Sequence, residues 1–259
     1  MTIVHLGRVE EQRAIVATAL HDGHETRSSL AGQFALSPAE RLREEDPYTG
    51  EWATVAPTYL VATRSRFEFD LNRPRNRAVY LEPDDAWGLD VWKTPLTPAQ
   101  LEESLGCYDR FYEMARVELE RVSSLYERFV VLDLHTYNHR RRGPAKPPAA
   151  PDLNPEVNIG TGSMDRVRWA SVVDALIGTL RKHGFDVREN VKFRGGHFAD
   201  WVHRLFPANG CCIAIEFKKT FMDEWTGELD QSRHQAIRAA LAATLDPLER
   251  ALDTCRTIA

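Results

Sequence analysis

The 259-residue sequence lacks the cysteine patterns that metal sites and disulfide frameworks produce. It has four cysteines, Cys107, Cys211, Cys212 and Cys255, and their spacing matches neither a zinc knuckle nor a Cys-x-x-Cys motif. Cys211 and Cys212 are adjacent, so in a strand their side chains would point to opposite faces and could not easily bond to each other. We therefore expect four reduced thiols, which are typical of a cytoplasmic protein.

Long apolar runs and an excess of basic charge are also absent. No run approaches the ~20 apolar residues that a membrane helix needs. The short apolar stretch at residues 3–6 is followed by a charged segment rather than by a signal-peptide pattern. The formal net charge is -5, whereas a general nucleic-acid-binding protein would be basic, and the one local basic run is at residues 140–142. The sequence thus predicts no membrane span and no nucleic-acid partner, and it leaves homo-oligomerisation open.

The composition allows a sizeable core, because 43% of the residues are hydrophobic. We predict one domain over residues 1–259. Apolar runs predict strands at residues 14–20, 59–62, 67–71, 129–136, 185–193 and 211–217. Helical spacing and capping signals predict helices at about residues 37–45, 97–128, 163–183, 198–205 and 231–252. Because strands alternate with helices and no internal repeat is present, we predict an α/β fold with a largely parallel sheet.

The stretch at residues 129–136 is the central feature of the sequence. Five of its first six residues are apolar, which is typical of a strand buried on both faces. The stretch ends in His135 and Thr136. Since ligands bind beyond the carboxyl ends of strands in open α/β sheets, His135 is a candidate metal ligand. The competing interpretation is a capping Asp133 with a hydrogen-bonded His135.

A second histidine, His21, directly follows the strand predicted at residues 14–20. Neutral imidazole is a common ligand of zinc, so His21 is also a candidate, although a simple turn capped by His21 and Asp22 is the competing interpretation. A catalytic zinc takes three protein ligands and leaves one position for water, so a carboxylate is needed as well. Asp46 is our first choice for it. The spacing leaves three alternatives open: Glu45, Glu25 and His24.

Candidate substrate-binding residues follow other predicted strands. Asn72 and Arg73 suit the anchoring of an acidic substrate, because arginine can bind a carboxylate through two parallel hydrogen bonds. Arg194 is a candidate second clamp, and the glycines at 195–196 allow close approach of the backbone to a ligand. The competing interpretations are an Asp70–Arg73 ion pair in a turn and a glycine hinge.

Glu216 is the candidate general base. It lies inside an apolar run, where an unpaired carboxylate is costly and where burial raises its pKa. Such a group beside a metal could take a proton from water and pass it to a leaving amine. An ion pair with Lys218 is the competing interpretation.

These candidates fall within a series of motifs that resembles a known family. The motifs are, in order, His21-Asp22-Gly23, Glu45-Asp46-Pro47-Tyr48-Thr49, Asp70-Leu71-Asn72-Arg73-Pro74, Asp133-Leu134-His135-Thr136, Arg194-Gly195-Gly196 and Ile215-Glu216. The series resembles the N-formylglutamate amidohydrolase family over about residues 15–225. It is similar, more distantly, to zinc carboxypeptidases and to the aspartoacylase and succinylglutamate desuccinylase group. Asp22 and Thr136 stand where the family usually has serine, and the run of arginines at residues 140–142 is a further departure.

The resemblance implies a three-layer α/β/α fold around a mixed sheet and one zinc ion per chain. The implied roles are zinc ligands at His21, Asp46 and His135, a general base at Glu216, and a substrate carboxylate held by Asn72 and Arg73. We therefore expect a zinc-dependent amidohydrolase that acts on an N-acyl acidic amino acid, N-formyl included, or on a related small carboxylate. Amide hydrolysis is better supported than formylglutamate as the substrate, because of the departures. Two alternatives stay open: a carboxypeptidase-like peptidase and a non-catalytic carboxylate- or peptide-binding module.

Overall fold

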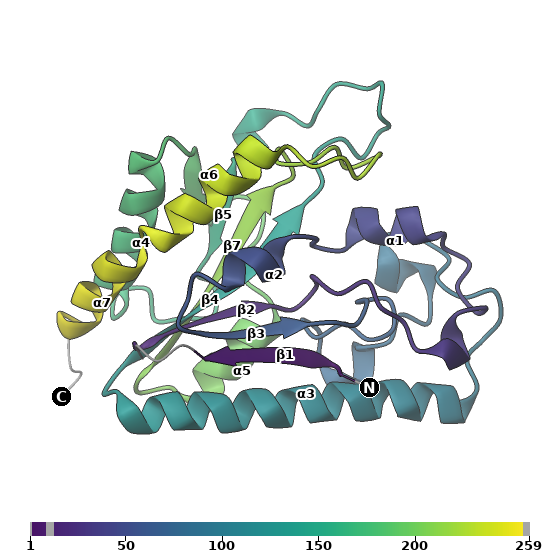
Figure 1. Ribbon diagram of the computed structural model, residues 1–259, viewed down its shortest axis with the longest axis horizontal. Coiled ribbons are helices and arrows are strands. Elements are labelled where there is room, and N and C mark those ends of the chain that lie inside the picture. Colours follow the sequence, from purple (N-terminus) through teal and green to yellow (C-terminus); the bar gives the residue numbers. More distant parts are fainter. Residues whose placement is uncertain (1, 9–12, 256–259) are drawn as a thin grey trace.

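The computed structural model describes residues 2–8 and 13–255, and its centre is a seven-stranded sheet (Figure 1). The strands are β1 (Val4–Arg8), β2 (Ile15–Ala19), β3 (Thr58–Ala62), β4 (Phe129–Tyr137), β5 (Val157–Gly160), β6 (Val187–Glu189) and β7 (Gly210–Lys218). Their order across the sheet is β1-β3-β2-β4-β7-β5-β6. Neighbouring strands are parallel except for the antiparallel pairs β1–β3 and β5–β7. The sheet is therefore mixed and largely parallel, as predicted.

Helices cover both faces of this sheet. They are α1 (Pro38–Glu44), α2 (Thr49–Ala53), α3 (Pro98–Leu125), α4 (Ala170–Lys182), α5 (His197–Leu205), α6 (Gln231–Ala242) and α7 (Leu245–Asp253), with short 3-10 helices at Ser28–Leu30, Arg75–Arg77, Pro83–Ala86 and Pro151–Leu153. Helices α2, α4, α6 and α7 lie over one face, and α3 and α5 lie over the other (Figure 1). Trp52 of α2 packs on Phe217 of β7, whereas Phe206 at the end of α5 packs on Phe129 of β4. The three-layer α/β/α prediction is confirmed.

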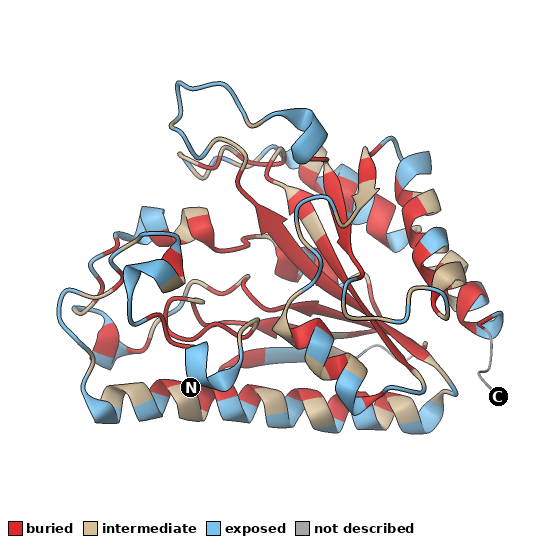
Figure 2. Ribbon diagram, turned by 180° about the vertical axis from the view of Figure 1, so that it is seen from behind, coloured by how far each residue is buried: buried red, intermediate tan, exposed pale blue. Residues whose placement is uncertain are grey.

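Strand β4 is the buried centre of the sheet. All nine of its residues are buried, and it pairs with β2 on one side and with β7 on the other (Figure 2). Its apolar residues supply packing to both helical layers, which is why the run at 129–136 has no polar alternation. His135 is the register partner of Glu216 on β7, so both side chains leave the sheet on the same face.

Capping residues determine where helices α1 and α3 begin. Ser37 begins α1 and Thr97 begins α3, and each forms a capping box with the residue three positions later, Glu40 or Gln100. A proline stands at the first position of both helices, where its missing N–H has no cost. Both predicted helix starts are confirmed.

The segment at residues 67–71 is not a strand, and that prediction was wrong. Glu68 N–H donates to the Ser65 carbonyl oxygen (2.9 Å), so the chain turns there. The buried carboxylates of Glu68 and Asp70 accept hydrogen bonds from Arg27 and Arg66. Buried charges need such partners, and the turn provides them where strand pairing would not.

Three further boundaries differ from the predictions. Helix α4 begins at Ala170 rather than near 163, because the Asp165 side chain accepts hydrogen bonds from two backbone N–H groups and holds a turn. The helix predicted at 231–252 is divided into α6 and α7, since the ring of Pro247 would clash with the carbonyl four residues earlier in a continuous helix. The strand predicted at 185–193 is only β6, and Asn190 ends it with a φ of +56°.

The cysteine and membrane predictions can be compared directly with the structure. All four cysteines are free and buried, so the predicted absence of disulfides is confirmed. Among the described residues, no helix is both long and apolar enough to span a membrane.

Candidate metal and active site

Parallel strands bring the predicted chemical residues to one edge of the sheet. His21 follows β2, while His135 and Glu216 lie near the carboxyl ends of β4 and β7. Asp46 follows α1, and its N–H donates to the His21 carbonyl oxygen (2.8 Å). The carboxyl edge of an open α/β sheet is where such folds bind ligands, and four chain segments meet there.

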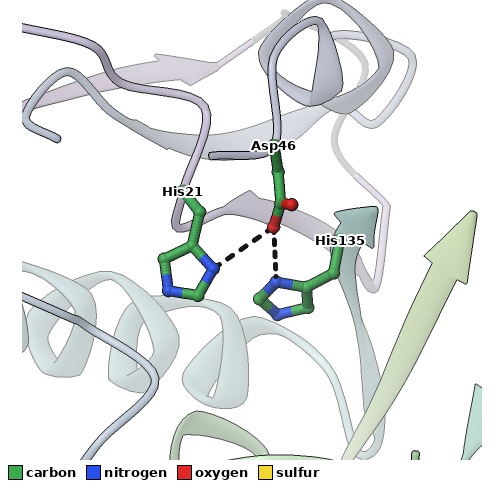
Figure 3. Close-up of side chains that lie close together, drawn as sticks. All are labelled: His21, Asp46 and His135. Carbon is green, nitrogen blue, oxygen red and sulfur yellow. Dashed lines mark hydrogen bonds and ion pairs between the residues drawn. The ribbon is translucent and has the colours of Figure 1, made fainter. Parts of the chain in front are cut away.

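His21, Asp46 and His135 form a buried cluster (Figure 3). Their potential ligand atoms all lie within 4.8 Å of one another. Asp46 Oδ2 lies 3.2 Å from His21 Nδ1 and 3.1 Å from His135 Nδ1. Among the described residues, no other group of three His, Cys, Asp or Glu side chains has this arrangement.

A second carboxylate lies on the far side of each imidazole. His21 Nε2 lies 2.8 Å from Asp70 Oδ1, and His135 Nε2 lies 3.1 Å from Asp133 Oδ2. Burial alone would raise the pKa of Asp70, but Arg66 and His21 hold it well below its usual range. Asp70 is thus an ionised acceptor for the N–H at His21 Nε2, an arrangement that would leave the Nδ1 lone pair for a metal ion in the cluster. Carboxylates commonly orient metal-binding histidines in this way.

The donor set fits a zinc ion. Two imidazole nitrogens and one carboxylate oxygen are donors that catalytic zinc sites use. At Zn–N and Zn–O distances near 2.0 Å, tetrahedral geometry separates neighbouring donor atoms by about 3.3 Å. The 3.1 and 3.2 Å separations around Asp46 Oδ2 are close to that value. The ligand atoms of all three side chains lie close enough together for one cation to contact them all.

The charges around the cluster also attract a cation. Burial alone would raise the pKa of Asp46, but His135 and His21 hold it well below its usual range. Burial alone would lower the pKa of His135, but Asp133 and Asp46 raise it well above its usual range. The cluster therefore favours a positive charge between its members.

Thr136 orients the carboxylate of Asp46. Its Oγ1 donates to Asp46 Oδ1 (2.8 Å), which leaves Oδ2 for the two histidines. We expect Thr136→Val to weaken zinc affinity about 10- to 100-fold, the range that loss of an outer partner typically causes. Competition with a zinc-binding dye measures this change. Thr136→Ser keeps the hydroxyl and is the matched control; equal losses in both variants would contradict the hydrogen-bond explanation.

The cluster opens into a cavity of about 200 Å³. His21, Asp46, Asn72, His135 and Glu216 are among its lining residues. The Glu216 carboxylate has no hydrogen-bond or ion-pair partner within the described part of the chain, and the Lys218 ammonium donates to the Asn154 carbonyl oxygen (2.9 Å) instead. Burial raises the pKa of Glu216 to about 7, although His135 opposes the shift. A carboxylate with this pKa can accept and release a proton near neutral pH.

The structure separates the three predicted substrate-binding residues. Asn72 lines the cavity, and its Oδ1 accepts a hydrogen bond from Phe198 N–H (3.0 Å). A Cβ atom at Gly196 would lie 2.3 Å from Asn72 Oδ1, so the glycine makes room for this side chain. Arg73 instead contacts the Asp85 carbonyl oxygen (2.7 Å), and Arg194 is exposed; neither lines the cavity.

The alternatives to Asp46 as third ligand have other partners. The Glu45 carboxylate lies 2.5 Å from His24 Nδ1 and accepts a hydrogen bond from the Ser65 hydroxyl. Glu25 forms an isolated β-bridge with Arg64. None of the three belongs to the cluster around His21 and His135.

Several lining residues were not predicted to bind substrate, among them Arg66, Trp87, Arg141 and Lys219. The Arg66 guanidinium lies 4.9 Å from the centre of the Trp87 ring, and that of Arg141 lies 5.6 Å from it. Only Arg141 had a signal in the sequence, the unusual run of arginines after His135. Arg66, Trp87 and Lys219 lie in turns or at strand ends, where no periodic pattern in the sequence predicts which way a side chain points.

A family model described as N-formylglutamate amidohydrolase matches residues 13–222. The family match identifies the chain as a hydrolase, and more narrowly as one of those that act on amides. The chain therefore belongs to the N-formylglutamate amidohydrolase family. This finding confirms the resemblance in the sequence motifs.

Two solved structures show the same fold. An N-formylglutamate amidohydrolase from Ralstonia eutropha JMP134 is 19% identical, with a TM-score of 0.73 and coverage of 97% of both chains. The gene product Atu2144 from Agrobacterium tumefaciens is 17% identical, with a TM-score of 0.68 and coverage of 98% of this chain and 96% of its own. A metallo-carboxypeptidase from Burkholderia cenocepacia is more distant, with a TM-score of 0.41, 13% identity and coverage of 97% and 61%. A comparison with curated proteins gave no match.

Proposed function

We propose that this chain is a zinc-dependent amidohydrolase with one zinc ion per chain. Its substrate would be an N-acyl acidic amino acid, N-formyl included, or a related small carboxylate. The observation that carries the proposal is the convergence of His21, Asp46 and His135 in a cavity that Glu216 also lines. The four free, buried cysteines support a reducing, cytoplasmic location.

In the proposed mechanism, three residues bind the metal and a fourth transfers the proton. His21, Asp46 and His135 would hold the zinc ion, which supplies Lewis acidity toward water and toward the amide carbonyl oxygen. The Glu216 carboxylate, deprotonated above its pKa of about 7, accepts a proton from the attacking water. The same carboxyl group then returns that proton to the departing nitrogen. The products would be an amino acid and a small acid.

Positive charge on the cavity lining supports a carboxylate-bearing substrate. Arg66 and Arg141 both line the cavity, where they pair with Asp70 and Glu44, and a guanidinium has further N–H donors for a substrate carboxylate. We propose that Asn72 contacts the substrate directly. Arg73 and Arg194 stay proposed substrate-binding residues; to reach the cavity, the Arg73 side chain would have to leave Asp85.

A substrate panel tests the proposed function. Zinc-loaded protein is incubated with N-formyl- and N-acetyl-L-glutamate and -L-aspartate and with short peptides, and the released amine is measured with fluorescamine. We expect turnover of the N-acyl acidic amino acids that is lost after zinc is chelated and restored when zinc is added. Release of C-terminal residues from peptides, with no turnover of any N-acyl amino acid, would overturn the proposal in favour of a peptidase.

A further inference from the structure

A second cavity, of about 290 Å³, adjoins the catalytic one. The two cavities share Asn138 and Arg141 as lining residues. The loop that follows β4 contributes part of this second lining, and its residues 140–142 are all arginine. Asn138 and Arg141 thus stand between the metal cluster and the second cavity.

The lining of the second cavity is positive and lacks acidic side chains. Arg141, Arg142 and Lys192 line it together with His139, and no Asp or Glu does so. This composition contrasts with the net charge of -5 for the whole chain. Burial lowers the pKa of Lys192, and the positive charge of Arg141 lowers it further.

Two arginines of the loop have acidic partners. The Arg140 guanidinium pairs with Asp223 (2.8 Å) and that of Arg141 pairs with Glu44 (2.7 Å), and neither acid lines the second cavity. Arg142, by contrast, has no hydrogen-bond or ion-pair partner within the described part of the chain. The Lys192 ammonium donates to Asn154 Oδ1 (2.7 Å) but has no acidic partner. Two cations of the second cavity are thus left for an anionic group.

We propose that this second cavity, through Arg142 and Lys192, binds a carboxylate at the end of the substrate that is distal to the scissile amide. The inference rests on the proposed function for the position of the scissile amide, but not for the binding of the anion. The carboxylate belongs to the part of the substrate that leaves as the amine. It is either the side-chain carboxylate of an acidic amino acid or the C-terminal carboxylate of a slightly longer N-acyl peptide.

The kinetic test compares charged substrates with neutral ones of the same size. N-acetyl-L-glutamate is paired with N-acetyl-L-glutamine, and N-acetyl-Ala-Ala with its C-terminal amide. In the double variant R142Q/K192Q we expect KM for the preferred charged substrate to rise at least about 10-fold, because two charge-assisted contacts are lost. The neutral partner should change less than about twofold. The pair that responds identifies which carboxylate binds.

Lys146→Gln is the matched control, since Lys146 is an exposed cation of the same loop that lies outside both cavity linings. A direct measurement of binding separates failure of this proposal from failure of the proposed function. The affinity of the purified protein for glutarate is measured by calorimetry. If no amide is hydrolysed but glutarate binding falls in R142Q/K192Q and not in K146Q, the anion site stands and the proposed function fails. If amides are hydrolysed but charged-substrate KM and glutarate affinity are the same in wild type and R142Q/K192Q, the anion site is overturned and the proposed function stands.

Discussion

Glu216→Gln is expected to lower kcat by about 10²- to 10⁴-fold, the range that general acid–base groups contribute. The substitution keeps the size of the side chain but removes its ability to accept a proton. Glu216 shares a cavity with His21, Asp46 and His135 but is not part of their cluster, so zinc content should stay at the wild-type level. Steady-state turnover of the best substrate, together with zinc analysis of the same sample, measures both effects.

Two other variants test whether the effect belongs to the position of Glu216. Glu224→Gln is a matched control, because burial also raises the pKa of Glu224 but this residue does not line the cavity. It should change kcat only a few-fold. Glu216→Asp keeps a carboxylate on a side chain that is one methylene shorter. Its kcat should therefore lie between those of wild type and Glu216→Gln. A Glu216→Gln enzyme with more than about a tenth of the wild-type kcat would remove Glu216 from the mechanism.

The sequence was most informative where burial and chemistry coincide on one strand. At residues 129–136 an apolar run predicted a doubly buried strand, and β4 is buried throughout. The polar end of that run placed His135 at the edge of the sheet because parallel strands end together. Capping residues at Ser37 and Thr97 were equally informative, since helix capping depends on a few neighbouring residues.

The sequence was least informative where tertiary partners decide the structure. Glu45 and Asp46 are adjacent acids, and only the fold turns Glu45 toward His24 and Asp46 toward the histidine cluster. Asp70 was expected only in an ion pair with Arg73. That contact is present (3.9 Å), but Asp70 also pairs with Arg66 (2.7 Å) and lies 2.8 Å from His21 Nε2. Such outer partners come from distant segments and have no spacing pattern. Strands β1 and β5 were missed because they are short and contain polar residues or glycine.

The arginines around the cavity also show that the sequence does not reveal which side chains face the site. The Asn72-Arg73 motif was a good local signal for carboxylate binding, yet only Asn72 lines the cavity. Arg66 and Arg141 line it instead, and they are 75 residues apart in the sequence. Sequence reasoning can identify residues suited to a carboxylate, but which of them face the cavity depends on how turns and loops pack.

His135→Ala is expected to abolish zinc binding and activity together. It removes one of the three proposed ligands. Loss of a residue that only orients a ligand lowers metal affinity about 10- to 100-fold, and loss of a ligand should lower it further. A zinc site with one histidine and one carboxylate would retain little metal after dialysis. Zinc per chain, measured by mass spectrometry, should drop from about one to below about 0.1, and amide turnover should become undetectable.

Thermal unfolding gives a readout of this variant that does not depend on activity. At a free zinc concentration of 100 times Kd, binding to the folded state alone stabilises a protein by about 2.7 kcal/mol. Wild-type protein should therefore show a clear rise in Tm when zinc is added, and His135→Ala should show none. His183→Ala is the control, because His183 is an exposed residue at the end of α4, outside the cluster and the cavity. A His135→Ala protein that binds one zinc and melts at a higher temperature with it would mean that the metal lies elsewhere. A wild-type protein that binds no zinc, yet binds acidic ligands, would favour the non-catalytic binding module.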